Sequence, residues 1–273
     1  MDGLSSIPWA NLGLAFAMSL AISAMGFRRV DYFVSLGYAF SIVAQALVFP
    51  FLYPAGLDVW TVLVDALYLA YGLRLGLFLL QRERAPSFAR EQKASLERGR
   101  HIKGWVKIAI WVSVAALYVA MYSPGQVLLA NAAATPERTF VVIGLVVMVL
   151  GLGLEALADW QKSAFKARNP ERFCDAGLFR IVRSPNYFGE MVFWLGGFIA
   201  TLGHFHAPLD WVLGLIGLVC IELIMLGSAR RLELKQAERY GRDPAYAAYA
   251  ARVPVIIPLL PIHSLRNLKV YLG

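Results

Sequence analysis

Residues 180–194 read RIVRSPNYFGEMVFW, a polar segment that turns into an apolar run. Ser184 is a good N-cap and Pro185 suits the first helical position, so a helix is expected to begin here. Glu190 then falls within an apolar helix. A charge is costly in a membrane helix, so a charged residue that is kept there is a candidate for a functional role. The stretch therefore predicts a membrane helix with a polar entrance.

The composition of the rest of the chain agrees with a membrane protein. Hydrophobic residues make up 59% of the 273 positions, more than a soluble domain of this length carries. Lipid offers backbone groups no hydrogen-bond partner, and the alternation of a membrane strand is absent, so apolar stretches of about 20 residues are expected to be helices. We predict an all-α, seven-helix membrane protein forming a single domain over 1–273. The expected spans are 8–26, 30–50, 59–80, 105–122, 139–159, 187–204 and 210–228.

The positive charges of the chain predict its orientation. The formal net charge is +8, and apart from Arg74 and Arg138 every Lys and Arg falls near 27–29, 81–107, 161–186 or 228–273. This asymmetry places those connections in the cytoplasm. We therefore expect a multi-pass protein of the cell's inner membrane, with its N-terminus outside and an ordered C-terminal cap in the cytoplasm. The basic loops suit anionic lipid or an anionic ligand rather than nucleic acid.

The cysteines and histidines do not predict a metal site. Cys174 falls on an expected cytoplasmic loop and Cys220 in the last span, so no disulfide is expected. His204 and His206 lack a third ligand, and a solvated loop explains them more simply than a metal does.

A charged face is expected where the fifth span leaves the membrane. Glu155, Asp159, Lys162 and Lys166 are spaced by 4, 3 and 4, which puts them on one side of a helix that continues beyond the bilayer. The face runs from acid to base. An ordinary ladder of ion pairs accounts for the spacing equally well, so the pattern alone leaves both readings open.

The polar entrance at Ser184 has the features of an anion site. A helix N-terminus presents free N–H groups, and Arg180 and Arg183 precede it, an arrangement that suits a phosphate. Asn186 and Glu190 are four residues apart and share a face. The alternative is that Glu190 only complements the helix dipole. That alternative leaves Asn186 and the arginines unexplained, so we favour a binding site.

A second polar stripe runs along the third span. Asp65, Tyr68, Tyr71 and Arg74 step by three, so each neighbours the next. A phenol beside a charged group is a hydrogen-bond donor for a buried carbonyl oxygen. The alternative is that these residues join helices or simply pack, and for either tyrosine alone packing is the simpler reading.

Several of these segments resemble a known enzyme family. DAGLFRIVRSPNYFGEMVFW, with ADWQKSAFKARNPERF before it and YGRDPAYAAYAARVPVIIP after it, is similar to the C-terminal signature of the membrane steroid 5-alpha-reductases. The superfamily includes sterol C14 reductases and isoprenylcysteine carboxyl methyltransferases. The chain looks like its bacterial branch of 3-oxo-5-alpha-steroid 4-dehydrogenase-like, DUF1295 membrane proteins. The match is strongest over 155–258 and looser in the N-terminal half.

The resemblance implies an enzyme that binds NADPH through residues 150–261 and a lipophilic substrate among the helices of 1–125. It places Asn186, Gly189 and Glu190 on cofactor positions, with Asp159 near the adenosine end and Arg172 in the basic loop. The cap residues Arg231, Tyr246 and Tyr249 would close over the cofactor. The full expected cofactor set is Asp159, Lys162, Lys166, Arg172, Arg180, Arg183, Asn186, Tyr187, Gly189, Glu190, Arg231, Tyr246 and Tyr249.

One departure from the family pattern concerns the substrate. The steroid reductases carry a Gln-Glu pair in the second helix, and that Glu works with a third-helix Tyr on the substrate's 3-oxo group. Here Gln45 is followed by Ala46, so a 3-oxo-steroid substrate is in doubt. Tyr71 best fits the Tyr position. Tyr68 is the second candidate, and Asp65 is a candidate for the role of the missing Glu.

The expected function is therefore transfer of a hydride from NADPH to an activated C=C bond of a lipophilic, steroid- or enone-like substrate taken from the bilayer. The methyltransferase branch of the superfamily, which uses S-adenosylmethionine, is the alternative enzyme. Asn186 with Glu190 is typical of the reductases and separates the two. A non-enzymatic lipid-binding protein is the third hypothesis. The sequence predicts no oligomeric state.

Overall fold

The computed structural model describes residues 3–84 and 89–269, and every regular element in these residues is a helix. The chain is divided into two compact units. Unit 1 comprises Met1–Leu145 and Gly197–Leu218, and unit 2 comprises Val146–Gly196 and Val219–Gly273. Each unit is described by itself.

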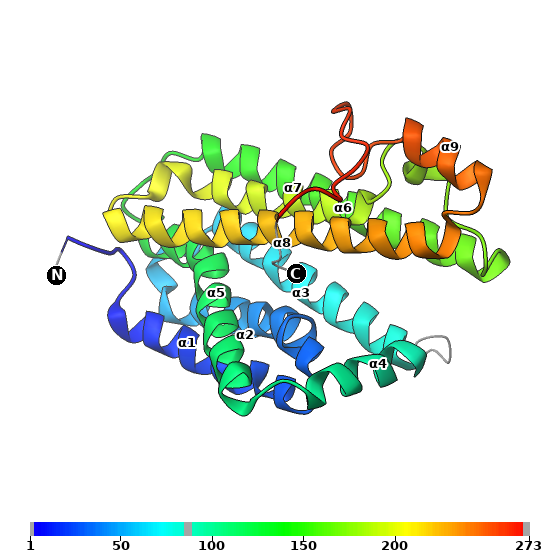
Figure 1. Cartoon of the computed structure of the whole chain (residues 1–273). Coiled ribbons are helices and arrows are strands. Elements are labelled where there is room, and N and C mark those ends of the chain that lie inside the picture. Colours follow the sequence, from blue (N-terminus) through cyan, green and yellow to red (C-terminus); the bar gives the residue numbers. More distant parts are fainter. Residues whose placement is uncertain (1–2, 85–88, 270–273) are drawn as a thin grey trace. The chain divides into compact units, whose positions relative to one another are not determined.

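Unit 1 is a bundle built mainly from the first half of the chain, drawn from blue to green in Figure 1. In it α2 packs on α3, and α1 packs against both α2 and α5. The helices are α1 (Trp9–Ser23), α2 (Leu36–Leu52), α3 (Val59–Arg84), α4 (Ala89–Arg100) and α5 (Gly104–Asn131). Short 3-10 helices join them: η1 (Ala24–Phe27), η2 (Val30–Phe33) and η3 (Pro54–Gly56).

Unit 2 contains most of three long helices and the short helix α9. The long helices are α6 (Thr139–Arg168), α7 (Pro185–Thr201) and α8 (Pro208–Tyr240), and the C-terminal turn of α7 and the first turns of α6 and α8 belong to unit 1. Two further 3-10 helices flank α7 in the chain: η5 (Gly177–Arg180), in unit 2, and η6 (Leu202–His204), in unit 1. After α8 the chain breaks at Gly241 and resumes as α9 (Pro244–Arg252), as the sequence predicts. Asp243 caps α9 by accepting a hydrogen bond from Ala245 N at 2.8 Å.

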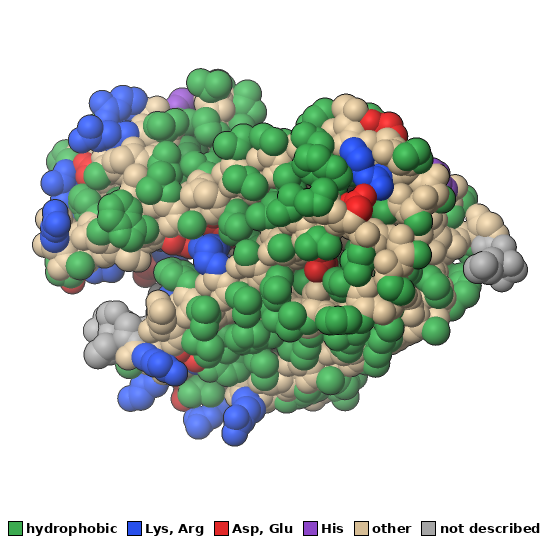
Figure 2. All heavy atoms as spheres, turned by 180° about the vertical axis from the view of Figure 1, so that it is seen from behind, with side chains coloured by type: hydrophobic (Ala, Val, Ile, Leu, Met, Phe, Trp, Pro, Cys, Tyr) green, Lys and Arg blue, Asp and Glu red, His purple; other side chains and the backbone are tan. Residues whose placement is uncertain are grey.

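Six helical segments are long and apolar enough to cross a membrane. They match the first five expected spans and the last one, each within a few residues at its start. The remaining expected span, 187–204, corresponds to α7, which has only 17 residues, so a seventh crossing stays a prediction. Figure 2 shows that hydrophobic side chains predominate on the face it draws, with Lys and Arg in separate clusters.

Two of the helices are longer than a bilayer requires. With 30 residues in α6 and 33 in α8, each extends about 45–50 Å, against a hydrocarbon core of about 30 Å. If the N-terminal part of each helix crosses the hydrocarbon core, its polar C-terminal turns extend beyond that core. This projection carries Lys162 and Lys166 on α6, and Glu233 and Arg239 on α8.

The connection at 81–107, expected to be a charged surface segment, contains α4. Ser95 of α4 donates a hydrogen bond to Asp31, and Gln92 Nε2 donates to Glu83 O at 2.9 Å. Arg29, only 8% exposed, pairs with Asp31 at 2.9 Å and also with Glu83. These contacts fix α4 to η2 and to the end of α3. The sequence did not predict this helix because its few apolar residues give it no membrane-like run.

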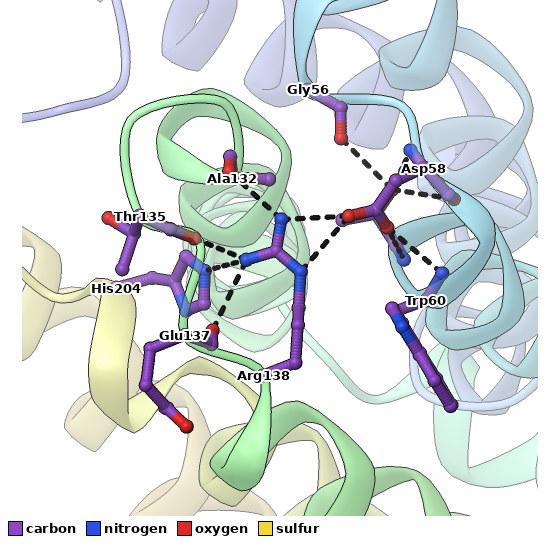
Figure 3. Close-up of polar contacts among 9 residues, drawn as sticks. Gly56, Asp58, Trp60, Ala132, Thr135, Glu137, Arg138 and His204 are labelled. Atoms are coloured by element: carbon purple, nitrogen blue, oxygen red, sulfur yellow. Dashed lines mark hydrogen bonds and ion pairs between the residues drawn. The ribbon is translucent and has the colours of Figure 1, made fainter.

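Arg138 organises the opposite end of unit 1, where α3 begins and α5 ends (Figure 3). Its Nε and Nη2 donate to Asp58 Oδ2 at 3.0 and 2.7 Å, and Nη2 also donates to Ala132 O at 3.0 Å. Asp58 Oδ1 accepts from the backbone N–H groups of Trp60 and Thr61 at 2.9 and 2.8 Å. Burial alone would raise the pKa of Asp58, but the Thr61 N–H and the Arg138 guanidinium outweigh it and hold this pKa below its ordinary value.

His204 of η6 completes this network. Its side chain is fully buried, and its Nε2 lies 3.4 Å from Arg138 Nη1. Since the guanidinium can only donate, His204 Nε2 must accept, which requires the neutral imidazole. Burial, then Arg138 and His206, lower the pKa of His204. Protonation would place two cations in contact.

We expect acid to destabilise unit 1 through His204. Between its lowered folded pKa and the ordinary value of about 6.5, the unfolded chain binds more protons than the folded one, so stability is lost as the pH falls through this window. The unfolding temperature in detergent, measured from pH 7.5 to 5, should fall for the wild type. His204→Gln, which keeps an acceptor but does not titrate, should flatten the profile.

His206→Gln is the matched control, because His206 is exposed and bonds only Thr135 Oγ1, at 2.9 Å, among the described residues. It should retain most of the wild-type pH dependence, because burial and Arg138, the two larger causes of the lowered pKa of His204, remain. A pH dependence unchanged in His204→Gln would contradict the assignment.

Candidate functional site

The charged face expected on α6 lies on one continuous helix. Glu155 is 3% exposed, and Asp159, Lys162 and Lys166 are half-buried. Lys166 Nζ donates to Tyr240 Oη at 2.8 Å, to Pro170 O at 3.2 Å and to Arg172 O. Lys166 therefore joins the end of α6, the following loop and the end of α8.

The loop between α6 and α7 is ordered by hydrogen bonds to the helices beside it. Gly177 adopts a φ of +58°, a conformation that favours glycine, and it starts η5. Gln161 Oε1 accepts from Leu178 N at 2.8 Å, and Phe179 O accepts from Tyr249 Oη at 2.7 Å. The loop is thus fixed to both α6 and α9.

The expected cap residues Tyr246 and Tyr249 hold α9 on this loop. Both are buried, and they form a core cluster with Phe173 and Val253. Burial raises the pKa of Tyr249 and, against the opposing effect of Arg183, that of Tyr246, so both phenols stay neutral. Tyr249 packs and donates a hydrogen bond to the loop, whereas Tyr246 contributes by packing, since its Oη has no hydrogen-bond partner among the described residues.

Arg172 and Arg180 lie on the surface of the loop. Arg172 Nη2 bonds Asp175 Oδ2 at 2.7 Å, and Arg180 Nε donates to Asp175 O at 3.3 Å. Arg231 of α8 is also exposed and makes only a long contact of 3.4 Å with Ser228 Oγ among its described bonds. These three guanidinium groups remain accessible to an anion.

Arg183, by contrast, is 3% exposed. Its Nη2 lies 3.6 Å from Glu233 Oε1, which is 4% exposed, and donates to His263 O. Its backbone N–H donates to Pro254 O at 2.9 Å. Sequence reasoning missed Glu233, which lies 50 positions away in a charged helix that offers many possible partners. A phosphate-binding role would require Arg183 to leave this ion pair.

The N-terminus of α7 begins at Pro185, as predicted. Glu190 is 6% exposed, Tyr187 is half-buried, and Asn186 Oδ1 is buried with no hydrogen-bond partner among the described residues. An amide oxygen in this state is unusual, because buried acceptors are nearly always paired. The entrance to α7 therefore offers an unused acceptor one turn from a buried carboxyl.

Gly189 allows α6 and α7 to approach closely. A Cβ at Gly189 would lie 2.6 Å from Glu155 N and 2.8 Å from Gly151 O. A Cβ at Gly151 would meet Phe193 N at 2.4 Å. The expected cofactor position Gly189 is thus a helix-packing position, and it sets the distance between the polar faces of the two helices.

The expected substrate residues Asp65, Tyr68 and Tyr71 are all buried on α3 in unit 1. Tyr122 of α5 donates a hydrogen bond to Asp65, and its ring meets that of Tyr68 at 5.3 Å. Asp65 and Tyr68 therefore share one partner from another helix.

Tyr71 belongs to a second cluster, which the sequence did not predict. Its Oη lies 2.7 Å from Tyr38 Oη, and the Tyr38 ring stacks on Tyr118 at 5.6 Å. Gln45 Nε2 donates to Tyr118 O at 3.2 Å. A tyrosine on an apolar helix has no sequence signal that reveals its partner, so Tyr38 and Tyr122 were missed.

Neither cysteine takes part in a disulfide bond. Cys174 and Cys220 are free thiols, and burial raises the pKa of Cys174. Within residues 3–84 and 89–269, no cluster of three His, Cys, Asp or Glu side chains is arranged to hold a metal ion.

We expect Gly189→Ala to destabilise unit 2 by about 1–3 kcal/mol, the usual cost of overpacking, because the added carbon meets backbone that cannot give way. Gly153→Ala on α6 is the control, since nothing lies within 4 Å of its Cβ position. Thermal unfolding in detergent measures both. Equal unfolding temperatures for the two variants would show that the α6–α7 approach is not tight.

Comparison with known proteins identifies the family of the chain. No curated protein and no solved structure matches the chain significantly. A family model described as "Protein of unknown function (DUF1295)" matches residues 21–253. That match covers most of the 273 residues, and the chain therefore belongs to the DUF1295 family.

Proposed function

We propose that the protein is a membrane-embedded, NADPH-dependent reductase. It transfers a hydride to an activated C=C bond of a lipophilic, steroid- or enone-like substrate. The observation that carries the proposal is the polar entrance of α7. There Asn186 Oδ1, which has no hydrogen-bond partner within residues 3–84 and 89–269, lies one turn from the buried Glu190. The resemblance of this segment to the steroid 5-alpha-reductases supports it.

The residues at this entrance fit a nicotinamide. Its carboxamide has an N–H donor for which the unused Asn186 oxygen is a complementary acceptor. Glu190 supplies a second acceptor on the same face of α7. When bound, the dihydronicotinamide supplies the hydride, and the protein supplies geometry and electrostatics.

The cations of unit 2 fit the phosphates of a dinucleotide. Arg172, Arg180 and Arg231 are exposed and offer guanidinium donors, which bind phosphate in bidentate geometry. Lys162 and Asp159 extend this polar surface along α6. Lys166 and Arg183 hold the loop and the C-terminal segment in place, so they contribute mainly by fixing the site.

The polar residues of unit 1 fit the polarisation of a substrate carbonyl. Tyr38 can donate to Tyr71, and in this proposal Tyr71 donates in turn to a substrate oxygen. Such a donor stabilises the negative charge that develops on that oxygen as the hydride arrives at the β carbon. Asp65 already accepts from Tyr122, which makes it less suited to donate. Tyr68 is the second candidate donor.

We expect NADPH to stabilise the detergent-solubilised protein and S-adenosylmethionine to have no effect. A ligand at 100 times its Kd adds about 2.7 kcal/mol, or roughly 5–10 °C in the unfolding temperature for a chain of this size. A thermal-shift assay with both compounds measures this. Stabilisation by S-adenosylmethionine alone would indicate a methyltransferase, and stabilisation by neither would indicate a non-enzymatic lipid-binding protein.

We expect Tyr71→Phe to lower kcat by about 10²-fold, the usual effect of removing one oxyanion donor, and to leave NADPH binding unchanged. The measurement is NADPH oxidation with enone substrates, together with NADPH titration. Tyr68→Phe is the matched variant on the same helix. Full turnover by Tyr71→Phe with loss in Tyr68→Phe would reassign the donor to Tyr68.

A further inference from the structure

Unit 2 contains a groove of about 670 Å³ between α9 and the loop that precedes α7. One face of α9 forms one wall, through Ala245, Ala248, Tyr249 and Arg252. The loop forms the other through Phe173, Asp175 and Arg180. The volume lies within the range of about 300–1,000 Å³ that is usual for small-molecule sites.

The walls of this groove are held in place. Tyr249 Oη donates to Phe179 O at 2.7 Å, and the Phe173 and Tyr249 rings lie 5.2 Å apart. Lys166 fixes the start of the loop through Pro170 O and Arg172 O. The groove is therefore present before any ligand binds, which lowers the cost of binding.

The charge of the groove is positive. Its single carboxylate, Asp175, is already paired with Arg172 at 2.7 Å. The guanidinium groups of Arg180 and Arg252 are exposed and lie on opposite walls, so their charges are left for a ligand. Two guanidinium groups beside aromatic rings suit a phosphate carried on a nucleoside.

We propose that this groove binds the 2′-phosphate of the cofactor's adenosine and so selects NADPH over NADH. The inference rests on the proposed function. A phosphate monoester carries about −1.5 to −2 charge at neutral pH, whereas NADH presents only a neutral hydroxyl at this position. An arginine beside the ribose is the usual means of accommodating a 2′-phosphate. Arg252 and Arg180 are the specificity-determining residues.

The test is the ratio of the Kd for NADH to that for NADPH, measured by nucleotide fluorescence on the full-length protein in detergent. The wild type should bind NADPH more tightly. Arg252→Gln should weaken NADPH binding about tenfold, the worth of one charge-assisted hydrogen bond, and leave NADH binding unchanged. Arg180→Gln should weaken NADPH binding more than NADH binding. Both side chains are exposed, so these variants should fold. Arg242→Gln, an exposed arginine of the turn before α9 that does not line the groove, should change neither value.

The outcomes separate this inference from the proposed function. If the wild type binds NADH and NADPH equally, or if Arg252→Gln and Arg180→Gln keep the wild-type preference, the groove is not the 2′-phosphate site and the reductase proposal stands. If the wild type binds neither nucleotide, both are overturned. Competition by 2′,5′-ADP that exceeds competition by 5′-ADP, and is lost in Arg252→Gln, would support the groove independently of the nicotinamide.

Discussion

The buried ion pair between Arg183 and Glu233 is the contact on which the polar end of unit 2 depends. Both side chains are almost fully removed from solvent, so each charge needs the other. Both side chains of the pair also hydrogen-bond to the backbone of the C-terminal segment. Arg183 donates to His263 O, and Glu233 Oε2 accepts from Leu265 N at 2.8 Å. Arg266 lies 3.6 Å from the same carboxylate. The start of α7, the polar end of α8 and the C-terminal segment are therefore joined at one point.

The cations of unit 2 fall into two groups, those that hold the backbone in place and those that are exposed. Lys166 and Arg183 donate to backbone carbonyls and hold loops in place, and removing either would leave acceptors unpaired. Arg180, Arg231 and Arg252 are exposed and are not needed for these contacts. An anionic ligand can use the second group without dismantling the first. Some of the many positive charges of the sequence therefore stabilise the structure, and others are available to bind a ligand.

The sequence predicted the helices well because hydropathy is a local property. Six candidate spans were located within a few residues at their starts. The start of α7 at Pro185 and the break at Gly241 follow from the backbone limits of proline and glycine. Helix α4 was missed because it is charged rather than apolar. Hydropathy alone does not decide whether α7 crosses the membrane, since its 17 residues are fewer than most membrane-spanning helices have.

The candidate sites were predictable only in part, because partners distant in sequence leave no local pattern. The spacing of Asp65, Tyr68 and Tyr71 identified a real buried stripe, but Tyr38 and Tyr122 come from other helices. Gly189 was identified by resemblance, and its physical role, the close approach of α6 to α7, required coordinates. The pairing of Arg183 with Glu233 was hidden for the same reason.

The tyrosine pair of unit 1 bears on the position where this chain has Ala46 and the steroid reductases that it resembles have a glutamate. Ala46 is buried, so no carboxyl enters the cluster from that position. A carboxyl must be protonated to donate a hydrogen bond, whereas a phenol keeps its proton at any physiological pH. Linked hydroxyls also polarise one another, so a Tyr38 that donates to Tyr71 strengthens Tyr71 as a donor. In the reductase proposed here, two neutral phenols can thus donate the hydrogen bond to the substrate carbonyl that the glutamate would otherwise help to provide. Unlike a buried carboxyl, the phenols do not have to be kept from ionising.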